Sequence, residues 1–152
     1  MEIKMAVYED LPEILQLQKL AYQSEAELLG DYSIQPLRQT LQELEEEFGR
    51  SIVLKITDDE TGKIIGSIRA AEQNGRVHVA KLIVHQDYRN KGLGTRLLTA
   101  IEAFYENKTF ELFTSSRSDK NLYLYNRCGY REFKRERVSE YYDFVFLEKN
   151  IL

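Results

Sequence analysis

The sequence has little cysteine and histidine, and it lacks any long apolar run. Cys128 is its one cysteine, which excludes an internal disulfide and a cysteine-rich zinc site. The two histidines, His78 and His85, stand without clustered carboxylates, so we expect no bound metal. No apolar run approaches the roughly 18 residues that cross a bilayer. Residues 1–4 have neither the basic start nor the apolar core of a signal peptide, and we therefore expect a soluble, cytoplasmic protein.

The composition is that of one globular domain. A chain of 152 residues fits the usual size of a single domain, and we expect that domain to span residues 1–152. With 43% hydrophobic and 30% charged residues, the chain can bury a core, which excludes the disordered class. Residues 1–75 carry a net charge of -8 and residues 76–152 carry +4. The basic half suits a polyphosphate ligand, whereas the overall charge of -4 opposes nucleic-acid binding.

The first third of the chain predicts one strand and two helices. Residues 2–7 have strand character, and Asp10, Pro12 and Glu13 form a typical helix start. The apolar pattern lapses around residues 25–33, which we expect to be irregular. Pro36 then opens a second helix. Its predicted buried stripe is Leu37, Leu41, Leu44 and Phe48, with Glu43, Glu45, Glu46 and Glu47 mostly towards solvent.

The middle of the chain changes to strand chemistry. Strands are expected over residues 51–57, 64–71 and 76–84, with a polar turn around residues 58–62. Asn74 and Gly75 separate the last two strands, and both tolerate the positive φ of a type I′ hairpin turn. The three strands are therefore predicted to be antiparallel neighbours.

The last third alternates helices and strands. A helix is expected after Gly92, with a buried stripe from Leu93 to Phe104, followed by a strand over residues 109–114. A further helix covers residues 118–127 and ends at Gly129. Residues 131–138 and 141–147 complete the prediction as two strands joined by a short turn.

The segment between the strand predicted at residues 76–84 and the next helix is the candidate ligand-binding loop. Gly92 and Gly94 leave backbone N–H groups uncovered at a helix N-terminus, where the helix dipole also favours a phosphate. Arg89 and Lys91 add positive charge. A P-loop is excluded because Thr-Arg follows Gly94 instead of Lys-Ser/Thr, and the dinucleotide fingerprint lacks its third glycine at Leu97.

Two segments together resemble one enzyme family. Residues 89–94, Arg-Asn-Lys-Gly-Leu-Gly, are similar to the Arg/Gln-x-x-Gly-x-Gly/Ala acetyl-CoA signature of the GNAT superfamily of N-acetyltransferases. Residues 118–130 resemble a later helix of that family, which carries an asparagine facing CoA and a tyrosine shortly before Gly-Phe or Gly-Tyr. The order of elements fits over nearly the whole chain.

The resemblance implies an α+β fold and a place for acetyl-CoA. The implied fold is a mostly antiparallel, twisted sheet of about seven strands, splayed in the middle and flanked by about four helices. Backbone groups freed by the splay would meet the pantetheine and polarise the thioester carbonyl, the pyrophosphate would rest on the loop amides, and Asn121 would reach CoA. The implied cofactor-binding residues are Leu82, Ile83, Val84, Arg89, Asn90, Lys91, Gly92, Leu93, Gly94, Thr95 and Asn121.

Acetyl transfer requires a neutral amine, a stabilised oxyanion and a proton for the departing thiolate. Tyr125 occupies the position that supplies the proton in many family members, and a phenol of pKa about 10 is protonated at neutral pH. His78, on the strand leading into the loop, is the candidate base. Glu25 and Glu27 are alternatives for that role and the candidate acceptor-binding residues. A relay in which Cys128 is acetylated first is a competing mechanism.

The sequence leaves the acceptor open. Our reading is direct transfer to a primary amine, which the acidic first half predicts to be cationic, carried by a small molecule or a peptide. A non-catalytic acyl-CoA-binding regulatory module is the alternative, and a nucleotide-dependent kinase or ATPase is disfavoured by the missing phosphate lysine. We expect no membrane partner, and a homodimer stays open.

Overall fold

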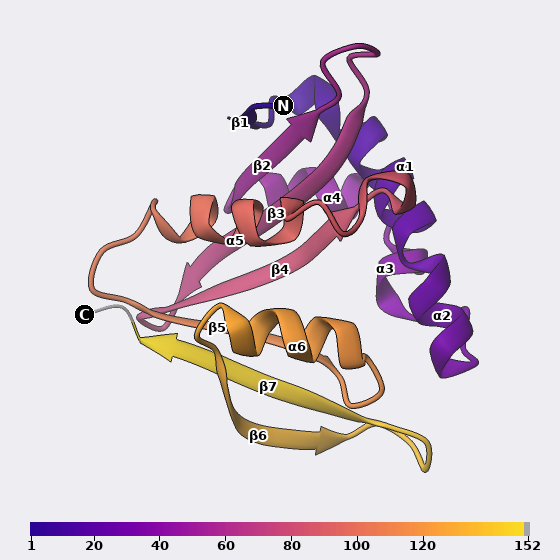
Figure 1. Cartoon of the computed structure of the whole chain (residues 1–152), viewed down its shortest axis with the longest axis vertical. Coiled ribbons are helices and arrows are strands. Elements are labelled where there is room, and N and C mark those ends of the chain that lie inside the picture. The colour runs from indigo at the N-terminus through magenta and orange to yellow at the C-terminus, as the bar shows by residue number, and fades with distance from the viewer. Residues whose placement is uncertain (151–152) are drawn as a thin grey trace.

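The computed structural model describes residues 1–150 and contains one mixed sheet with helices on both faces (Figure 1). The strand order is β1-β2-β3-β4-β5-β7-β6. The strands are β1 (Ile3–Met5), β2 (Ile52–Thr57), β3 (Ile64–Gln73), β4 (Arg76–Val84), β5 (Thr109–Ser115), β6 (Arg131–Arg137) and β7 (Asp143–Asn150). The α-helices are α1 (Leu11–Ala21), α2 (Gln23–Leu29), α3 (Gln35–Arg38), α4 (Leu41–Phe48), α5 (Leu93–Glu102) and α6 (Asp119–Arg127). The predicted α+β class, with a mostly antiparallel sheet, is confirmed.

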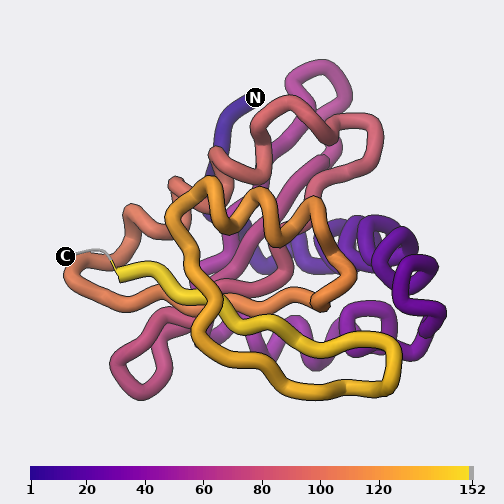
Figure 2. The backbone as a smooth tube through the Cα atoms, turned by 60° about the horizontal axis from the view of Figure 1, so that its bottom comes forward, coloured from indigo at the N-terminus to yellow at the C-terminus, as the bar shows by residue number. Residues whose placement is uncertain are grey.

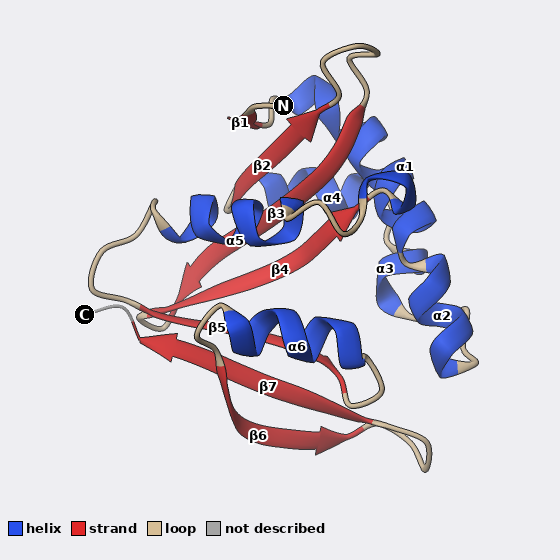
Figure 3. Cartoon of the chain, in the orientation of Figure 1, coloured by secondary structure: helices blue, strands red, loops and turns tan. Residues whose placement is uncertain are grey.

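The helices divide between the two faces of the sheet. Helices α5 and α6 lie on one face (Figure 1), where apolar side chains of Leu97, Phe110 and Leu147 are among those that form the larger core. The other core joins α1 and α4 to the opposite face of β2–β4 through residues such as Ile14 and Leu44. On that opposite face, β5, β7 and β6 carry exposed side chains instead of a packed helix (Figure 3).

The sheet opens between β4 and β5. These two strands run parallel and pair only through Arg76–His78 and Thr109–Glu111, at one end of each strand. Residues 79, 80, 83 and 84 of β4 pair with β3, and none of residues 79–84 pairs with β5. A strand edge with unpaired backbone groups therefore lines the opening. This is the splayed sheet that the family resemblance implied.

Two predictions for the N-terminal helices are wrong. Residues around 25–33 are not irregular throughout, because Gln23–Leu29 is helical and ends at Gly30 in the left-handed conformation. The helix predicted from Pro36 is two helices, α3 and α4. Thr40 separates them because its side chain accepts from the Glu43 N–H and its own N–H donates to the Glu43 carboxylate, which forms a capping box.

The predicted turn and helix cap are confirmed, whereas the predicted ends of two later elements are wrong. Asn74 and Gly75 both have positive φ between β3 and β4, as a type I′ turn requires. Gly129 has φ 96°, and Tyr130 N–H donates to the Tyr125 carbonyl, which completes a Schellman cap after α6. Phe104 was predicted to be buried, but α5 ends at Glu102 and Phe104 is exposed. The last strand also begins later than predicted and runs to Asn150.

A buried arginine ties the N-terminal helices to the sheet. Arg69 of β3 is 2% exposed and donates to Gln18 of α1, to Gln39 and to the Glu47 carboxylate of α4. We call these four residues the Arg69 network. Glu47 was predicted to point mostly towards solvent with its neighbours, but its side chain is partly buried because it is the counter-ion of Arg69.

Candidate functional site

The loop between β4 and α5 presents free backbone donors. Asn90 and Gly92 have φ of 63° and 77°, so the chain turns sharply before the helix. Asn tolerates this conformation and glycine adopts it without strain. The Arg96 N–H donates to the Gly92 carbonyl as the first turn of α5 closes. The N–H groups of residues 93–95 precede that bond and have no acceptor within the helix, which suits an anion.

The charged side chains of the loop lie close to its backbone. Lys91 stands over the ring of Tyr88, with 5.7 Å between Nζ and the ring centroid. Arg89 turns back, and its guanidinium donates to the carbonyls of Val84 at 3.3 Å and Ala21 at 3.5 Å. It therefore joins the end of β4 to the end of α1, and its charge lies beside the opening.

Gly94 is where α5 approaches α6. A Cβ built at this position would lie 3.3 Å from Cδ2 of Leu124, which is the end of a flexible side chain. A small side chain can be accommodated there by a slight shift of Leu124. Glycine at this position thus leaves the backbone of the first turn of α5 uncovered. No clash with another backbone segment requires a glycine there.

A bulge shapes the free edge of β4. Ser67 pairs with Ile83 and Arg69 with Ala80, so Lys81 and Leu82 together face Ile68. Lys81 has φ 54°, which is uncommon for a side chain of this kind. Burial, followed by the nearby Arg69 charge, lowers the pKa of Lys81 to about 8. The bulge interrupts the regular strand next to Leu82, Ile83 and Val84, which border the opening.

Helix α6 forms the other side of the opening. Asn121 donates from Nδ2 to the Thr114 hydroxyl of β5 at 3.2 Å. Tyr125 is 7% exposed, and burial, with smaller effects from Tyr22 and Glu25, raises the pKa of its hydroxyl above the usual value. Among residues 1–150, no hydrogen bond involves this hydroxyl, and no fully enclosed side-chain atom is left without a partner. The Tyr125 hydroxyl therefore borders accessible space.

Glu25 lies at the N-terminal end of α6. It sits in the first turn of α2 and accepts hydrogen bonds from the Ser115 hydroxyl at 3.0 Å and from the Ser118 hydroxyl. Burial, opposed by Arg69 and reinforced by Glu25, raises the pKa of Tyr22 to about 12. Tyr22, Glu25 and Tyr125 thus come together where α1, α2 and α6 meet at the end of β5.

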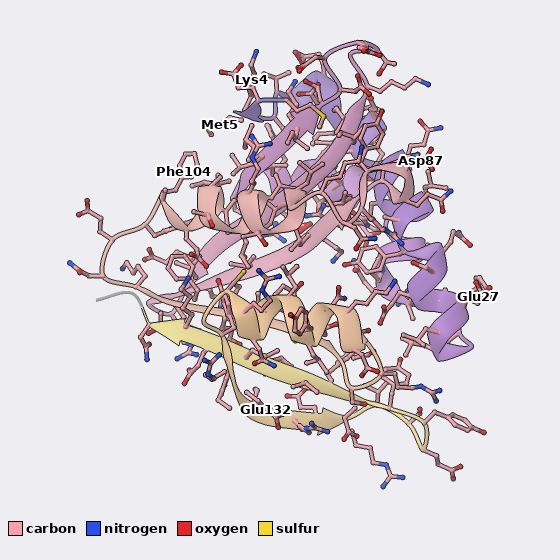
Figure 4. The ribbon with its side chains drawn as sticks, in the orientation of Figure 1. Lys4, Met5, Glu27, Asp87, Phe104 and Glu132 are labelled. Atoms are coloured by element: carbon pink, nitrogen blue, oxygen red, sulfur yellow. The ribbon has the colours of Figure 1, made fainter. Side chains whose placement is uncertain are left out.

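The remaining candidates, His78 and Glu27, line two different hollows. His78 is at the last paired position between β4 and β5, where its Nδ1 lies 3.8 Å from the Glu111 carboxylate. It borders a hollow of about 180 Å³ that Arg50 also lines. Glu27 points away from α2 (Figure 4) and lines a hollow of about 430 Å³ with Tyr141. Figure 2 shows the turn between β6 and β7 reaching towards α2 at this hollow.

The structure brings Tyr125 and Glu25 together and leaves Glu27 outside this group. Sequence reasoning missed Tyr22, Ser115 and Ser118 as their neighbours. No local motif marks them, because they come from three different segments. Ser115 directly follows the strand predicted at residues 109–114, and Ser118 begins the helix predicted at residues 118–127; these positions are the sequence signals that could have pointed to them.

Cys128 is a free cysteine of intermediate exposure that packs against the larger core. Within residues 1–150, no group of three or more His, Cys, Asp or Glu side chains has the arrangement of a metal site. None of the helices in the same residues has the length and apolar character needed to span a membrane.

Comparisons with known proteins agree with this geometry. The family model described as "Acetyltransferase (GNAT) domain" matches residues 20–151. The protein UPF0157 protein YqkA of Bacillus subtilis (strain 168) is 25% identical over 129 residues, and the match covers 84% of this chain. The chain spans only 36% of the length of that curated relative.

Solved structures share the fold. PaiA N-acetyltransferase from Thermoplasma acidophilum, in complex with coenzyme A, has a TM-score of 0.79 and 18% identity, over 99% of this chain and 100% of its own. The phosphinothricin acetyltransferase from Sinorhizobium meliloti, in complex with acetyl-CoA, has a TM-score of 0.76 and 16% identity, over 99% of this chain and 88% of its own. At these identities the likeness is one of fold.

Proposed function

The chain belongs to the GNAT family of acetyltransferases, and we propose that it transfers an acetyl group from acetyl-CoA directly to a primary amine, with residues 1–152 acting as one domain. The observation that carries the proposal is the opening between β4 and β5, where an unpaired strand edge adjoins the bare amides of α5. The structures of fold relatives with coenzyme A or acetyl-CoA support the choice of donor.

The residues around the opening fit an acyl-CoA. The N–H groups of residues 93–95 and the charges of Arg89 and Lys91 suit a pyrophosphate. The unpaired edge at Leu82, Ile83 and Val84 suits the amides of a pantetheine arm, because both are extended chains of alternating donors and acceptors. Asn121 stands on the facing helix with its amide directed to β5.

In the proposed reaction the amine nitrogen bonds to the thioester carbonyl carbon, the carbon–sulfur bond breaks, and the thiolate takes a proton. Bound acetyl-CoA supplies the activated acetyl group. Tyr125 donates the proton in this proposal, since burial raises its pKa and keeps it protonated throughout the neutral range. The hydroxyl has no competing partner among residues 1–150, so its proton is available.

The incoming amine must lose a proton before it attacks. An alkylammonium has a pKa of about 10.4, so a base near the opening assists. We assign this role to His78, which is partly exposed and faces the Glu111 carboxylate at 3.8 Å. A carboxylate beside an imidazole stabilises the imidazolium that forms. Glu25 is assigned to attract the cationic amine, and Glu27, which lines the hollow beside Tyr141, is not assigned that role.

The test is release of free CoA from acetyl-CoA in the presence of a panel of primary amines. Turnover is expected with at least one amine, and acetyl-CoA binding is expected by calorimetry. Binding without turnover of any amine would favour the alternative, a non-catalytic acyl-CoA-binding module. Absence of binding would refute both readings.

A substitution at Gly94 locates the donor site. Gly94→Glu introduces a negative charge beside the bare amides of α5, and we expect acetyl-CoA affinity to fall at least 100-fold. Gly94→Ala carries the same Cβ towards Leu124 without the charge, and we expect its affinity to stay within a few-fold of the original. Equal affinities for Gly94→Glu and the unaltered protein, with both folded by circular dichroism, would place the pyrophosphate elsewhere.

A further inference from the structure

One row of side chains on β5 leads from the neighbour of His78 to the neighbour of Glu25. Side chains of a strand alternate between faces, so Glu111, Phe113 and Ser115 share the face opposite α6. Glu111 is beside His78, and Ser115 donates to Glu25. Phe113 therefore lies between the candidate base and the candidate amine-binding carboxylate. It is 50% exposed, although its neighbours Leu112 and Thr114 are buried against α6.

Two further aromatic rings extend this position across the next strand. Phe146 is paired with Phe113, and Phe144 with Ser115. The ring centroids of Phe113 lie 4.9 Å from Phe144 and 5.3 Å from Phe146. We call Phe113, Phe144 and Phe146 the aromatic floor. It is continuous with the end of the opening between β4 and β5.

The outer edge of the floor already has cationic neighbours. Lys134 lies with Nζ 4.5 Å from the centroid of Phe146, and Arg76 lies 5.3 Å from that of Phe133, farther out on β6. Arg76 is in turn held by Glu111 and Glu148. Phe113, at the inner edge, has no such side chain over it among residues 1–150, so the ring nearest the opening is the free one.

The half-exposed ring of Phe113, two partly buried rings beside it and the nearby Glu25 carboxylate match a ligand that is apolar and cationic at once. Covering the ring faces with an apolar body makes the free energy of binding more favourable. An ammonium is attracted by the Glu25 carboxylate and by the rings. A polyamine would satisfy the carboxylates but leave the floor exposed to water. An anionic acceptor would meet Glu25 unfavourably, whereas Glu111 is already paired with Arg76.

We infer that the acceptor of the proposed reaction is an amphipathic amine, whose aromatic or similarly broad apolar body lies on the aromatic floor within a few bonds of the reacting nitrogen. This inference rests on the proposed function and specifies the substrate class of the same site. Phe113 is its specificity-determining residue, since it lies on β5 between Glu111, which is beside His78, and Ser115, which donates to Glu25.

The sheet edge next to the floor opposes strand pairing with a second copy of the chain. β6 is an edge strand whose residues are all exposed and mostly charged, and its pairing with β7 is irregular near Phe133. Charged side chains and bulges are features that oppose pairing between the edges of two sheets.

The experiment compares 2-phenylethylamine with ethylamine by the release of CoA from acetyl-CoA, with kcat/KM expressed per concentration of the unprotonated amine, because the phenyl group lowers the basicity of the nitrogen. We expect kcat/KM to be at least tenfold higher for 2-phenylethylamine. Phe113→Ala should lower the ratio of the two kcat/KM values about tenfold. Phe104→Ala serves as the matched control, because Phe104 is similarly exposed, at 46%, but lies beyond the end of α5, away from the opening (Figure 4). The control should leave the ratio unchanged.

The outcomes separate this inference from the proposed function. No turnover of either amine, with acetyl-CoA bound, would refute the proposed function. Turnover of both amines with a ratio near one, or a ratio that Phe113→Ala leaves unchanged, would overturn the substrate class alone. Sedimentation provides the last comparison: a dimer that Phe113→Ala converts to monomers would assign the floor to a second copy and would also overturn the inference.

Discussion

The two halves of the sheet differ on the face opposite α5 and α6. In the half formed by β1–β4, α1 and α4 cover this face, and the first seven residues of β3 are all buried. In the half formed by β5, β7 and β6, the same face is open, and all seven residues of β6 are exposed. The covered half carries the buried Arg69 network, and the open half carries the aromatic floor.

This difference separates two tasks within one sheet. The covered half fixes the N-terminal helices, and with them Glu25, relative to β4. The open half leaves side chains available for a ligand that varies in shape. The halves meet through three residue pairs of β4 and β5, so the candidate reacting groups gather where rigid and open regions adjoin.

The largest expected effect concerns the boundary between the halves. Tyr125→Phe removes the proposed proton donor and keeps the ring packing, so kcat should fall about 100-fold or more, with little change in acetyl-CoA affinity. Burial raises the pKa of Tyr125 above about 10, so kcat of the unaltered enzyme should not decline through its ionisation below that pH. CoA release measured from pH 6 to 9 checks both points.

The control for this substitution is Tyr123→Phe, on the same helix. Tyr123 is 66% exposed, and loss of its hydroxyl should leave kcat unchanged. If Tyr125→Phe and Tyr123→Phe retain the same kcat, then Tyr125 contributes packing alone and proton transfer comes from water.

The next effect tests the covered half directly. Arg69→Met removes the cation from a buried network, leaving the Glu47 carboxylate without its counter-ion and the Gln18 amide oxygen without its donor, which should reduce the free energy of unfolding by about 3 kcal/mol. Arg135→Met makes the same change on the open half, where Arg135 pairs with Glu132 at the exposed edge. Exposed pairs contribute little, so this variant should change stability by less than about 1 kcal/mol.

Urea unfolding of both arginine variants measures the contrast. Equal losses of stability would mean that the N-terminal helices are held by their apolar contacts alone. The Arg69 network would then contribute nothing to the difference between the two halves.

The smallest effect concerns Lys81, beside the Arg69 network. Its pKa is lowered to about 8 in the folded protein, first by burial, and returns to about 10.5 on unfolding. The charged form therefore destabilises the fold below pH 8, and this cost disappears as the pH rises through 8 towards 10.5. Because one pKa unit corresponds to about 1.4 kcal/mol, Lys81→Met should stabilise the protein by roughly 1 to 3 kcal/mol at pH 7 and by nearly nothing at pH 10.5.

Thermal or urea unfolding at the two pH values checks this dependence, with Lys63→Met as an exposed control. A gain for Lys81→Met that is the same at both pH values would attribute the effect to added apolar contact, not to the charge.

Features encoded by neighbouring residues were predictable from the sequence. The turn at Asn74 and Gly75, the helix start after Gly92 and the cap at Gly129 each follow from conformations that few residues adopt. Helix α2 escaped prediction because Ala26 is its one buried residue. With a single position to bury, it has no apolar stripe to recognise.

Features that join distant segments were not predictable. Arg69 finds its partners on α1, α4 and the segment between α3 and α4, and the sequence spacing contains no sign of them. Phe113, Phe144 and Phe146 show an alternating pattern, but whether they face a core or solvent depends on where the helices lie. The roles of the individual site residues stay predictions until the substitutions above are measured.

The short seam between β4 and β5 has a thermodynamic consequence. Residues 79–84 form a strand edge without a neighbour on β5, so part of the sheet depends on β3 alone. A ligand that binds in this opening contributes the missing strand only in the folded state. By mass action, saturation at 100 times the dissociation constant adds about 2.7 kcal/mol to the stability. For the proposed donor, acetyl-CoA, resistance to unfolding, and to proteolysis through unfolding, should therefore rise with the concentration of the ligand.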